Sequence, residues 1–336
     1  MEHTPIIHVG LPKTASTSLQ KVFNSSDQFY YLGRGCSASM IDYVSPEIEI
    51  AAEIDLRFRR KLLFNKEKFV DSFTRQLDRG YSQSKIPVFS SEYLAWASVD
   101  EIDLVDKVNR LALAFPSGTK ILMFVREQND LLKSIYRESV RQGFFRSYSA
   151  FIDNAWEKQD RNWLPCLNYG AIKSLYEEFF GKDSVLVLPY EWYKESPNLV
   201  NERLNNFLGL NCNFVSSGIA NQALDDSQLL AMRFLNEKIR HTVGNDVLAG
   251  LQDYFAPSYF KQELSRSVPN QSLVDERLRK VLLKASMELK NPHVKIDFSA
   301  NADVIRAMNA QFADNNAKLS QDLNVDLKSL GYATGP

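Results

Sequence analysis

Lysine and hydroxyl side chains gather in one short segment near the start of the chain, Gly10–Ser18. The segment follows a short apolar run, Pro5–Val9, and precedes apolar residues at helical spacing, which predicts a strand, a polar loop and a helix. The first amides of a helix lack intrahelical partners and carry the positive end of its dipole, so they can bind a phosphate or sulfate. We therefore expect an anion site, with a full charge from Lys13 and hydroxyl donors from Thr14, Ser16, Thr17 and Ser18.

This loop differs from the loop that binds ATP in many nucleotide enzymes. That motif is GxxxxGK[ST], with its lysine near the start of the helix. Here Lys13 comes early and the second glycine is absent. Thr14 or Ser16 is the expected cap of the helix that follows the loop. An ordinary capped turn with a surface lysine is the alternative interpretation.

An arginine and a serine form a second candidate site in the segment ILMFVREQNDLLKS. Arg126 ends an apolar run, Lys120–Val125, and Ser134 follows eight residues later in a helical pattern, Asn129–Gln142. A guanidinium group can bind a phosphate through two hydrogen bonds, and a serine hydroxyl can add a third. The alternative is a salt-bridged arginine and a serine on a helix surface.

Short apolar runs alternate with helical patterns along the first two thirds of the chain. This alternation predicts an α/β fold in which helices flank a central parallel sheet. Ligands bind such sheets at the carboxyl ends of the strands, so both candidate sites belong to one edge. The predicted strands are Pro5–Val9, Ile86–Phe89, Lys120–Val125 and Ser184–Leu188.

Strand patterns are absent from two long stretches of the sequence. Residues 25–80 have mostly helical spacing and predict a helical insertion. Beyond residue 224 the helical patterns are Leu224–Ile239, Leu273–Leu289 and Asp303–Leu319. We therefore predict a core domain over residues 1–224 and a helical C-terminal extension over 225–336 that packs on the core.

Composition excludes several classes of protein. The 336 residues include 40 Lys and Arg against 41 Asp and Glu, a balance that argues against a nucleic-acid-binding protein. No apolar run approaches the roughly 18 residues of a membrane span, and the N-terminus does not resemble a signal peptide, so we expect a cytoplasmic protein. The three distant cysteines, Cys36, Cys166 and Cys212, predict neither a zinc site nor a disulfide framework.

The two candidate sites together resemble those of sulfotransferases that use 3′-phosphoadenosine 5′-phosphosulfate (PAPS). The segment PKTASTSLQ resembles the family's 5′-phosphosulfate loop, and VREQNDLLKSIYRESVRQG resembles its 3′-phosphate motif. A later portion, from Tyr169-Gly170 through Pro189-Tyr190-Glu191 to Phe207-Leu208-Gly209, resembles bacterial members, so that the likeness covers roughly residues 5–235.

The resemblance implies that the fold is a P-loop-like three-layer sandwich, that PAPS is the co-substrate and that no metal is required. It implies that Arg126 and Ser134 hold the 3′-phosphate. Two positions depart from the family, since Ala15 replaces a common glycine and Ser18 replaces a common alanine. The residues implied for the 5′-phosphosulfate are Lys13, Thr14, Ala15, Ser16, Thr17 and Ser18.

Transfer of a sulfuryl group to a hydroxyl requires a base for the acceptor and a cation for the leaving oxygen. Lys13 is our candidate for the cation. Glu92, in FSSEYL, is our candidate base, because it follows a predicted strand and family members often use a glutamate there. We interpret His8 as a core residue and Glu191 as structural. His3, His241 and His293 are weaker candidates for the base.

The predicted function is transfer of the sulfuryl group from PAPS to a hydroxyl of a carbohydrate or related acceptor, a glycan or glycolipid. Asn221 is a further candidate for contact with the nucleotide. Aromatic side chains that could stack on a sugar, or pack in the core, are Phe144, Phe145, Tyr148 and Trp163. A P-loop nucleotide kinase or NTPase and a non-catalytic nucleotide-binding interaction protein are the alternatives. The sequence does not determine the oligomeric state.

Overall fold

A computed structural model describes residues 4–33, 43–97, 101–215, 225–243 and 295–335, together with positions 281 and 284. Cys36, Asn221, His3 and His293 lie outside the described residues, as do the side chain of His241 and all but two positions of the helix predicted over 273–289.

The chain divides into two compact units. The first comprises Met1–Gln128, Pro165–Ala220 and Ala310–Pro336, and the second comprises Asn129–Leu164 and Asn221–Asn309. The sheet and its flanking helices belong to the first unit. The domain boundary near residue 224 stays a prediction.

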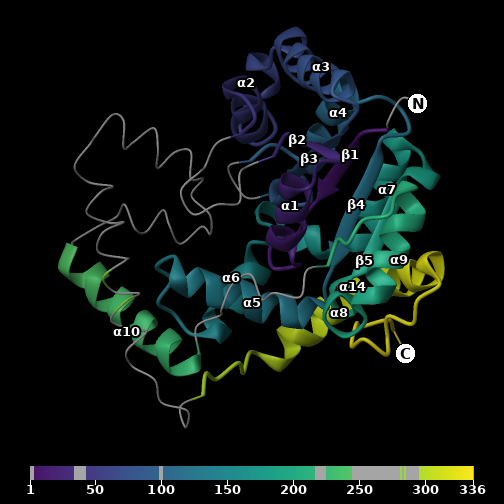
Figure 1. The fold of residues 1–336 in the computed structure, drawn as a ribbon. Coiled ribbons are helices and arrows are strands. Elements are labelled where there is room, and N and C mark those ends of the chain that lie inside the picture. The colour runs from purple at the N-terminus through teal and green to yellow at the C-terminus, as the bar shows by residue number, and fades with distance from the viewer. Residues whose placement is uncertain are drawn as a thin grey trace. The chain divides into compact units, whose positions relative to one another are not determined.

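A single sheet of five parallel strands runs through the first unit, in the order β2-β3-β1-β4-β5 (Figure 1). This confirms the predicted α/β class and the central parallel sheet. Strand β2 was not predicted, because it is an outermost strand of only three residues and lies inside a stretch with mostly helical spacing. The strands are β1 (Ile6–Val9), β2 (Phe29–Tyr31), β3 (Ile86–Ser91), β4 (Lys120–Val125) and β5 (Val185–Pro189).

Most predicted helices are present with shifted ends. Helix α4 begins directly after Asp103, which caps it, the Asp103 carboxylate accepting a hydrogen bond from the Val105 amide at 2.7 Å. The helices that lie wholly within the first unit are α1 (Ser16–Ser25), α2 (Pro46–Ile50), α3 (Lys66–Ser82), α4 (Leu104–Ala114), α7 (Tyr169–Phe180), α8 (Tyr190–Glu195) and α9 (Pro197–Leu208). The short helical turns of the described chain are η1 (Ala51–Asp55), η2 (Lys61–Leu63), η3 (Glu92–Leu94), η4 (Gln159–Arg161), η5 (Leu164–Leu167) and η6 (Lys182–Ser184).

The remaining long helices are α5 (Gln128–Arg141), α6 (Tyr148–Glu157), α10 (Asp226–Val243) and α14 (Ala302–Leu323). None of the helices in the described part of the chain is both long and apolar enough to cross a bilayer.

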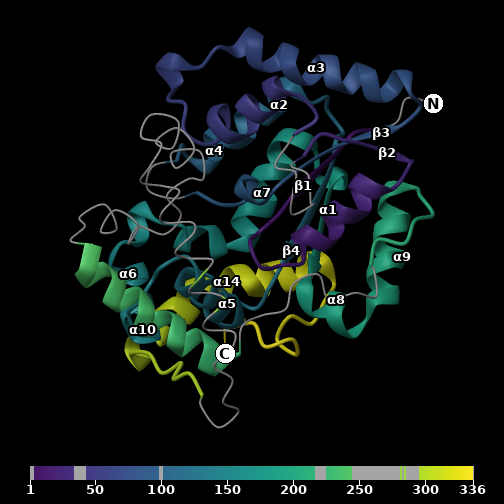
Figure 2. The same cartoon turned by 60° about the vertical axis from the view of Figure 1, so that its left-hand side comes forward.

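Helices cover both faces of the sheet (Figures 1 and 2). Successive side chains of a strand point to opposite faces. On one face Ile6 and Phe124 share a buried cluster with Phe23 of α1 and Leu204 of α9. On the other face the Phe89 ring packs against Phe73 of α3, with ring centroids 5.1 Å apart. The first unit therefore has three layers, as predicted.

Two cysteines lie among the described residues, and both are free thiols. Cys166 is buried, and burial raises the pKa of its thiol to about 11, so the thiol stays protonated at neutral pH. Cys212 is partly buried.

Candidate functional site

Four strands of the first unit end at the same edge of the sheet, where a glycine and three polar or aromatic residues follow them. Gly10 follows β1, Glu92 follows β3, Arg126 follows β4 and Tyr190 follows β5. Strands β3 and β4 pair in parallel with β1 on either side, so their ends lie next to the β1 loop.

The loop between β1 and α1 makes a tight corner. Lys13 and Ala15 have φ angles of 68° and 66°, in the left-handed region. Ala15 is the N-cap of α1 and offers no side-chain acceptor, so the prediction that Thr14 or Ser16 caps this helix was wrong. Because no side chain caps α1, its first amides remain suited to an anion.

Two of the predicted hydroxyl donors bond to the loop itself. The hydroxyls of Thr14 and Ser16 both donate to the Leu11 carbonyl, at 2.7 and 3.1 Å. Both side chains are buried, as is Ser18, whereas Thr17 is half-buried. A hydroxyl has one hydrogen to donate, so in this conformation Thr14 and Ser16 fix the shape of the loop.

Arg126 lies against this loop. Its guanidinium donates a hydrogen bond to the Lys13 carbonyl at 3.2 Å. The guanidinium carbon is also 5.0 Å from the centre of the Tyr190 ring, a cation–π contact. The Arg126 carbonyl accepts a hydrogen bond from the Tyr169 hydroxyl at 2.6 Å. Arg126 is therefore held on both its side chain and its backbone, and the structure brings it together with Lys13.

Tyr190 was not recognised from the sequence as a partner of Arg126. Its position directly after β5 is the signal that could have identified it, because Glu92 and Arg126 follow their strands in the same way.

Ser134 lies on α5 in the second unit and is partly buried. The basic residues around it form ion pairs within that unit, Lys133 with Asp130 at 3.2 Å and Arg137 with Asp226 at 2.5 Å. A joint role of Arg126 and Ser134 stays a prediction.

The aromatic residues considered for a sugar are partly in the core of the second unit. Tyr148 and Trp163 are buried, and both pack against Phe151 with ring centroids 6.1 and 5.9 Å away. Core packing is therefore the correct interpretation for these two. Phe144 and Phe145 are partly buried.

Glu92 begins η3, beside the β1 loop. A methyl group placed on Gly10 would lie 3.4 Å from the Glu92 Cγ atom and 2.8 Å from the Ser16 hydroxyl. The Gly10 amide donates to the Ser91 carbonyl at 3.2 Å. The absence of a side chain at Gly10 therefore lets Glu92 and the loop approach each other closely.

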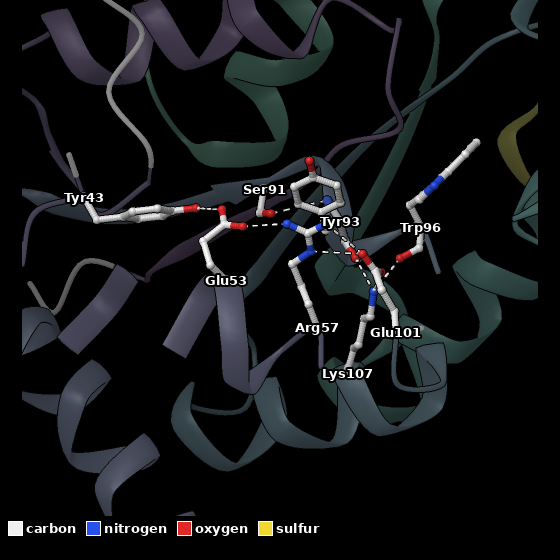
Figure 3. A network of polar contacts seen from close by, with 8 residues as sticks. All are labelled: Tyr43, Glu53, Arg57, Ser91, Tyr93, Trp96, Glu101 and Lys107. Carbon is white, nitrogen blue, oxygen red and sulfur yellow. Dashed lines mark hydrogen bonds and ion pairs between the residues drawn. The ribbon is translucent and has the colours of Figure 1, made fainter. Parts of the chain in front are cut away.

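The residues after Glu92 rest on a buried polar network (Figure 3). The Lys107 ammonium donates to the carbonyls of Tyr93 and Trp96 at 3.0 and 2.5 Å. The Tyr176 hydroxyl donates to the Leu94 carbonyl at 2.8 Å. Three carbonyls that follow Glu92 are therefore held by side chains from other elements.

Four charged groups in this network balance one another. Arg57 bonds to Glu53 at 2.6 Å and to Glu101 at 2.9 Å, and Lys107 pairs with Glu101. The Arg57 guanidinium carbon lies 3.3 Å from the centre of the Tyr93 ring. Burial lowers the pKa of Lys107, and attraction to Glu101 opposes this shift. Two buried cations and two buried anions thus form a neutral cluster, which limits the penalty of burying charge.

Sequence reasoning missed this cluster. Glu53 and Arg57 lie in one segment, Glu101 and Lys107 lie in a later one, and each of the four alone is typical of a helix surface. The signal present was Lys107 beside Val108 and Leu111, on the apolar side of α4.

His8 and Glu191 have structural partners. The His8 Nδ1 atom is 2.8 Å from the Ser90 hydroxyl, and burial lowers the pKa of His8 to about 4. The Glu191 carboxylate accepts hydrogen bonds from the Glu127 amide and the Tyr332 hydroxyl, both at 3.0 Å. Among the described residues, no three His, Cys, Asp or Glu side chains are grouped to hold a metal ion.

No protein-family model matches the sequence, and no curated protein matches it. The structure is similar to the crystal structure of a sulfotransferase from Alicyclobacillus acidocaldarius, with a TM-score of 0.51 and 15% identity over 98% of each chain.

Two further solved structures match with lower TM-scores. For the sulfotransferase domain of the Synechococcus PCC 7002 olefin synthase the TM-score is 0.35 at 15% identity, over 72% of this chain and 95% of that one. For mouse sulfotransferase SULT7A1 complexed with PAP it is 0.37 at 13% identity, over 85% of this chain and 89% of that one. The likeness to the Alicyclobacillus structure shows that the chain has a sulfotransferase-like fold.

Proposed function

We propose that this chain is a sulfotransferase that moves the sulfuryl group of PAPS to a hydroxyl of a carbohydrate or related acceptor. The main support is the hydrogen bond from Arg126 to the Lys13 carbonyl. It joins the loop that would bind the 5′ end of the nucleotide to the arginine that would bind the 3′-phosphate. The sulfotransferase-like fold is consistent with this proposal.

In the proposed donor site, the first amides of α1 and the Lys13 ammonium bind the 5′-phosphosulfate. Thr14 and Ser16 hold the loop through the Leu11 carbonyl, and the left-handed backbone at Ala15 makes the turn. Thr17 and Ser18 add hydroxyls at the start of the helix. Arg126, together with Ser134, binds the 3′-phosphate.

Sulfuryl transfer then proceeds by in-line displacement, by analogy with phosphoryl transfer. The acceptor oxygen forms a bond to sulfur while the bond from sulfur to the bridging phosphate oxygen breaks. Glu92 takes the proton of the acceptor hydroxyl. Lys13 stabilises the negative charge that develops on the departing adenosine 3′,5′-bisphosphate (PAP). The products are a sulfate ester and PAP, and no electrons are gained or lost.

The buried network would act as a support for the base. Lys107 donates hydrogen bonds to the carbonyls of Tyr93 and Trp96, and Tyr176 donates one to the carbonyl of Leu94. The Arg57 guanidinium packs against the Tyr93 ring. A proton acceptor must be held within hydrogen-bond reach of the acceptor hydroxyl, so rigid support of η3 would raise the rate.

Transfer of labelled sulfate from PAPS to a panel of soluble glycans tests the catalytic assignments. Lys13→Ala should lose most transfer. Glu92→Gln should lose turnover while its affinity for PAP remains near wild type. Lys21→Ala and Glu67→Gln, exposed residues of α1 and α3, are the matched controls and should keep wild-type rates. Wild-type turnover by Glu92→Gln would exclude Glu92 as the base.

Calorimetry separates the proposal from its alternatives. A sulfotransferase should bind PAP far more tightly than ATP with magnesium. The reverse preference would indicate a nucleotide kinase or NTPase. PAP binding without transfer to any acceptor, in the wild type and in Glu92→Gln alike, would indicate a non-catalytic nucleotide-binding protein.

A further inference from the structure

A single turn of the first unit presents two leucines that the fold leaves uncovered. Leu62 is 98% exposed and Leu63 is 71% exposed, both in η2 between η1 and α3. No other large apolar side chain among the described residues is as exposed as Leu62. Apolar surface in water is unfavourable, and two adjacent leucines at one tip therefore point to an apolar partner.

The turn is anchored from one side. The Leu63 amide donates to the Arg60 carbonyl at 2.9 Å, which closes the turn. The neighbouring Phe64 ring lies 4.1 Å from the Arg110 guanidinium carbon and 5.3 Å from the Phe69 ring. Phe64 therefore fixes the segment on the protein, while the leucines face outward.

Positive charge surrounds the two leucines. Between residues 59 and 68 the sequence has five Arg and Lys and a single acidic residue, in a chain whose net charge is −1. Arg59 pairs with Asp55. The exposed cations of the segment are Arg60, Lys61, Lys66 and Lys68. Exposed apolar side chains with a basic flank are typical of segments that lie in the interface of an anionic membrane.

The small size of the patch favours lipid over a protein partner. A stable protein interface buries about 800 Å² on each side, far more than two leucine side chains supply. A bilayer needs no matching surface, because a few apolar side chains enter the acyl boundary while the cations meet the headgroups. We propose that the η2 turn docks the protein on an anionic lipid surface through Leu62 and Leu63.

Topology places this turn on the side of the sheet where the strands end. Helix α3 begins three residues after η2 and ends four residues before β3 begins, so it runs back across the sheet toward the starts of the strands (Figure 2). The beginning of α3, and η2 before it, therefore lie toward the edge that carries Glu92. Docking through η2 would bring this edge toward the lipid surface.

Co-sedimentation of the full chain with vesicles tests the proposal. The wild type should bind vesicles of phosphatidylcholine with phosphatidylglycerol, and bind poorly to phosphatidylcholine alone. Replacing both leucines (Leu62→Ser with Leu63→Ser) should weaken binding about tenfold or more. Arg60→Glu with Lys61→Glu should weaken it by at least that much, since each cation contributes roughly fivefold. Val105→Ser with Leu113→Ser, which removes two exposed apolar residues of α4, is the matched control and should bind as the wild type does.

Three results would overturn this proposal. They are the absence of binding to anionic vesicles, equal binding by the leucine variant, and a change of oligomeric mass in the leucine variant, which would make the turn an interface between copies. PAP affinity and sulfate transfer to a soluble acceptor should be unchanged in all these variants. The docking proposal can therefore fail while the proposed sulfotransferase function stands, and the converse also holds.

Discussion

The Arg126 guanidinium donates a hydrogen bond to the carbonyl oxygen of Lys13, at a distance of 3.2 Å. The two residues are far apart in the sequence and follow neighbouring strands, β4 and β1. A guanidinium group has five hydrogens to donate, so this bond uses only part of its capacity. The same side chain can therefore brace the loop and bind a phosphate, which a lysine could not do equally well.

The first prediction concerns the shape of this side chain. Arg126→Lys keeps the positive charge but lacks the planar guanidinium that can donate two hydrogen bonds to one phosphate. PAP binding should therefore weaken by about tenfold to a hundredfold, the contribution of one charge-assisted hydrogen bond. Calorimetry with PAP measures the change. Arg203→Lys, an exposed position on α9, is the control. Unchanged affinity of Arg126→Lys would show that charge alone suffices there.

The second prediction concerns the buried network under η3. Lys107→Met leaves Glu101 without one of its two cations and should lower the free energy of unfolding by about 3–5 kcal/mol. Lys107→Met combined with Glu101→Gln removes one charge of each sign and should lower it less than the single change does. Urea denaturation compares the two.

A catalytic readout distinguishes support of Glu92 from stability alone. Tyr176→Phe removes only the hydrogen bond to the Leu94 carbonyl and should leave a folded protein, at a cost of about 1 kcal/mol. If the network positions the base, kcat should fall severalfold while the KM for PAPS stays constant. A change in the KM for PAPS as large as the change in kcat, or no change in either, contradicts the positioning role.

Patterns within one segment predicted much of the fold and the outline of the site. The apolar runs predicted β1, β3, β4 and β5 because a buried parallel strand is almost entirely apolar. Arg126 was identified as a candidate because it directly follows such a run. Neither observation needs contacts between distant segments.

Contacts between distant segments account for most of what was missed. The pairing of Arg57 with Glu101, and the hydrogen bond from Lys107 to the Tyr93 carbonyl, depend on how helices pack on the sheet. The inward direction of the Thr14 hydroxyl depends on the left-handed corner next to it, which an alanine at position 15 does not indicate. No local pattern of residue types contains this information.

The third prediction follows from that corner. Ala15 has a φ of 66°, where an L-residue is less stable than glycine by about 1–2 kcal/mol. Ala15→Gly relieves this strain, although glycine also stabilises the unfolded chain by about 0.4–1 kcal/mol. The net gain in the free energy of unfolding should be about 0.5–1 kcal/mol.

A matched substitution in an ordinary helix should act in the opposite direction. Ala112→Gly, inside α4, should lower the free energy of unfolding by about 1 kcal/mol. Chemical denaturation of both variants measures the two effects together. Destabilisation by Ala15→Gly would contradict a strained, left-handed Ala15 in the folded chain.

The fourth prediction concerns the buried histidine of β1. Burial lowers the pKa of His8 to about 4 from an ordinary value of 6.5. As the pH falls below 6.5, the unfolded chain binds a proton at this position and the folded chain does not, until the pH reaches about 4. The free energy of unfolding should therefore fall over this window, by about 3 kcal/mol from this group alone.

Other groups also titrate in this range, so the measurement is a difference between two proteins. His8→Gln cannot take up a proton, and its stability should depend less on pH between 7 and 4 than that of the wild type. The wild-type advantage should be greatest at neutral pH and should shrink as the solution is acidified. Parallel stability curves for the two proteins would mean that His8 titrates equally in the folded and unfolded chains, which is incompatible with a buried, neutral imidazole bonded to Ser90.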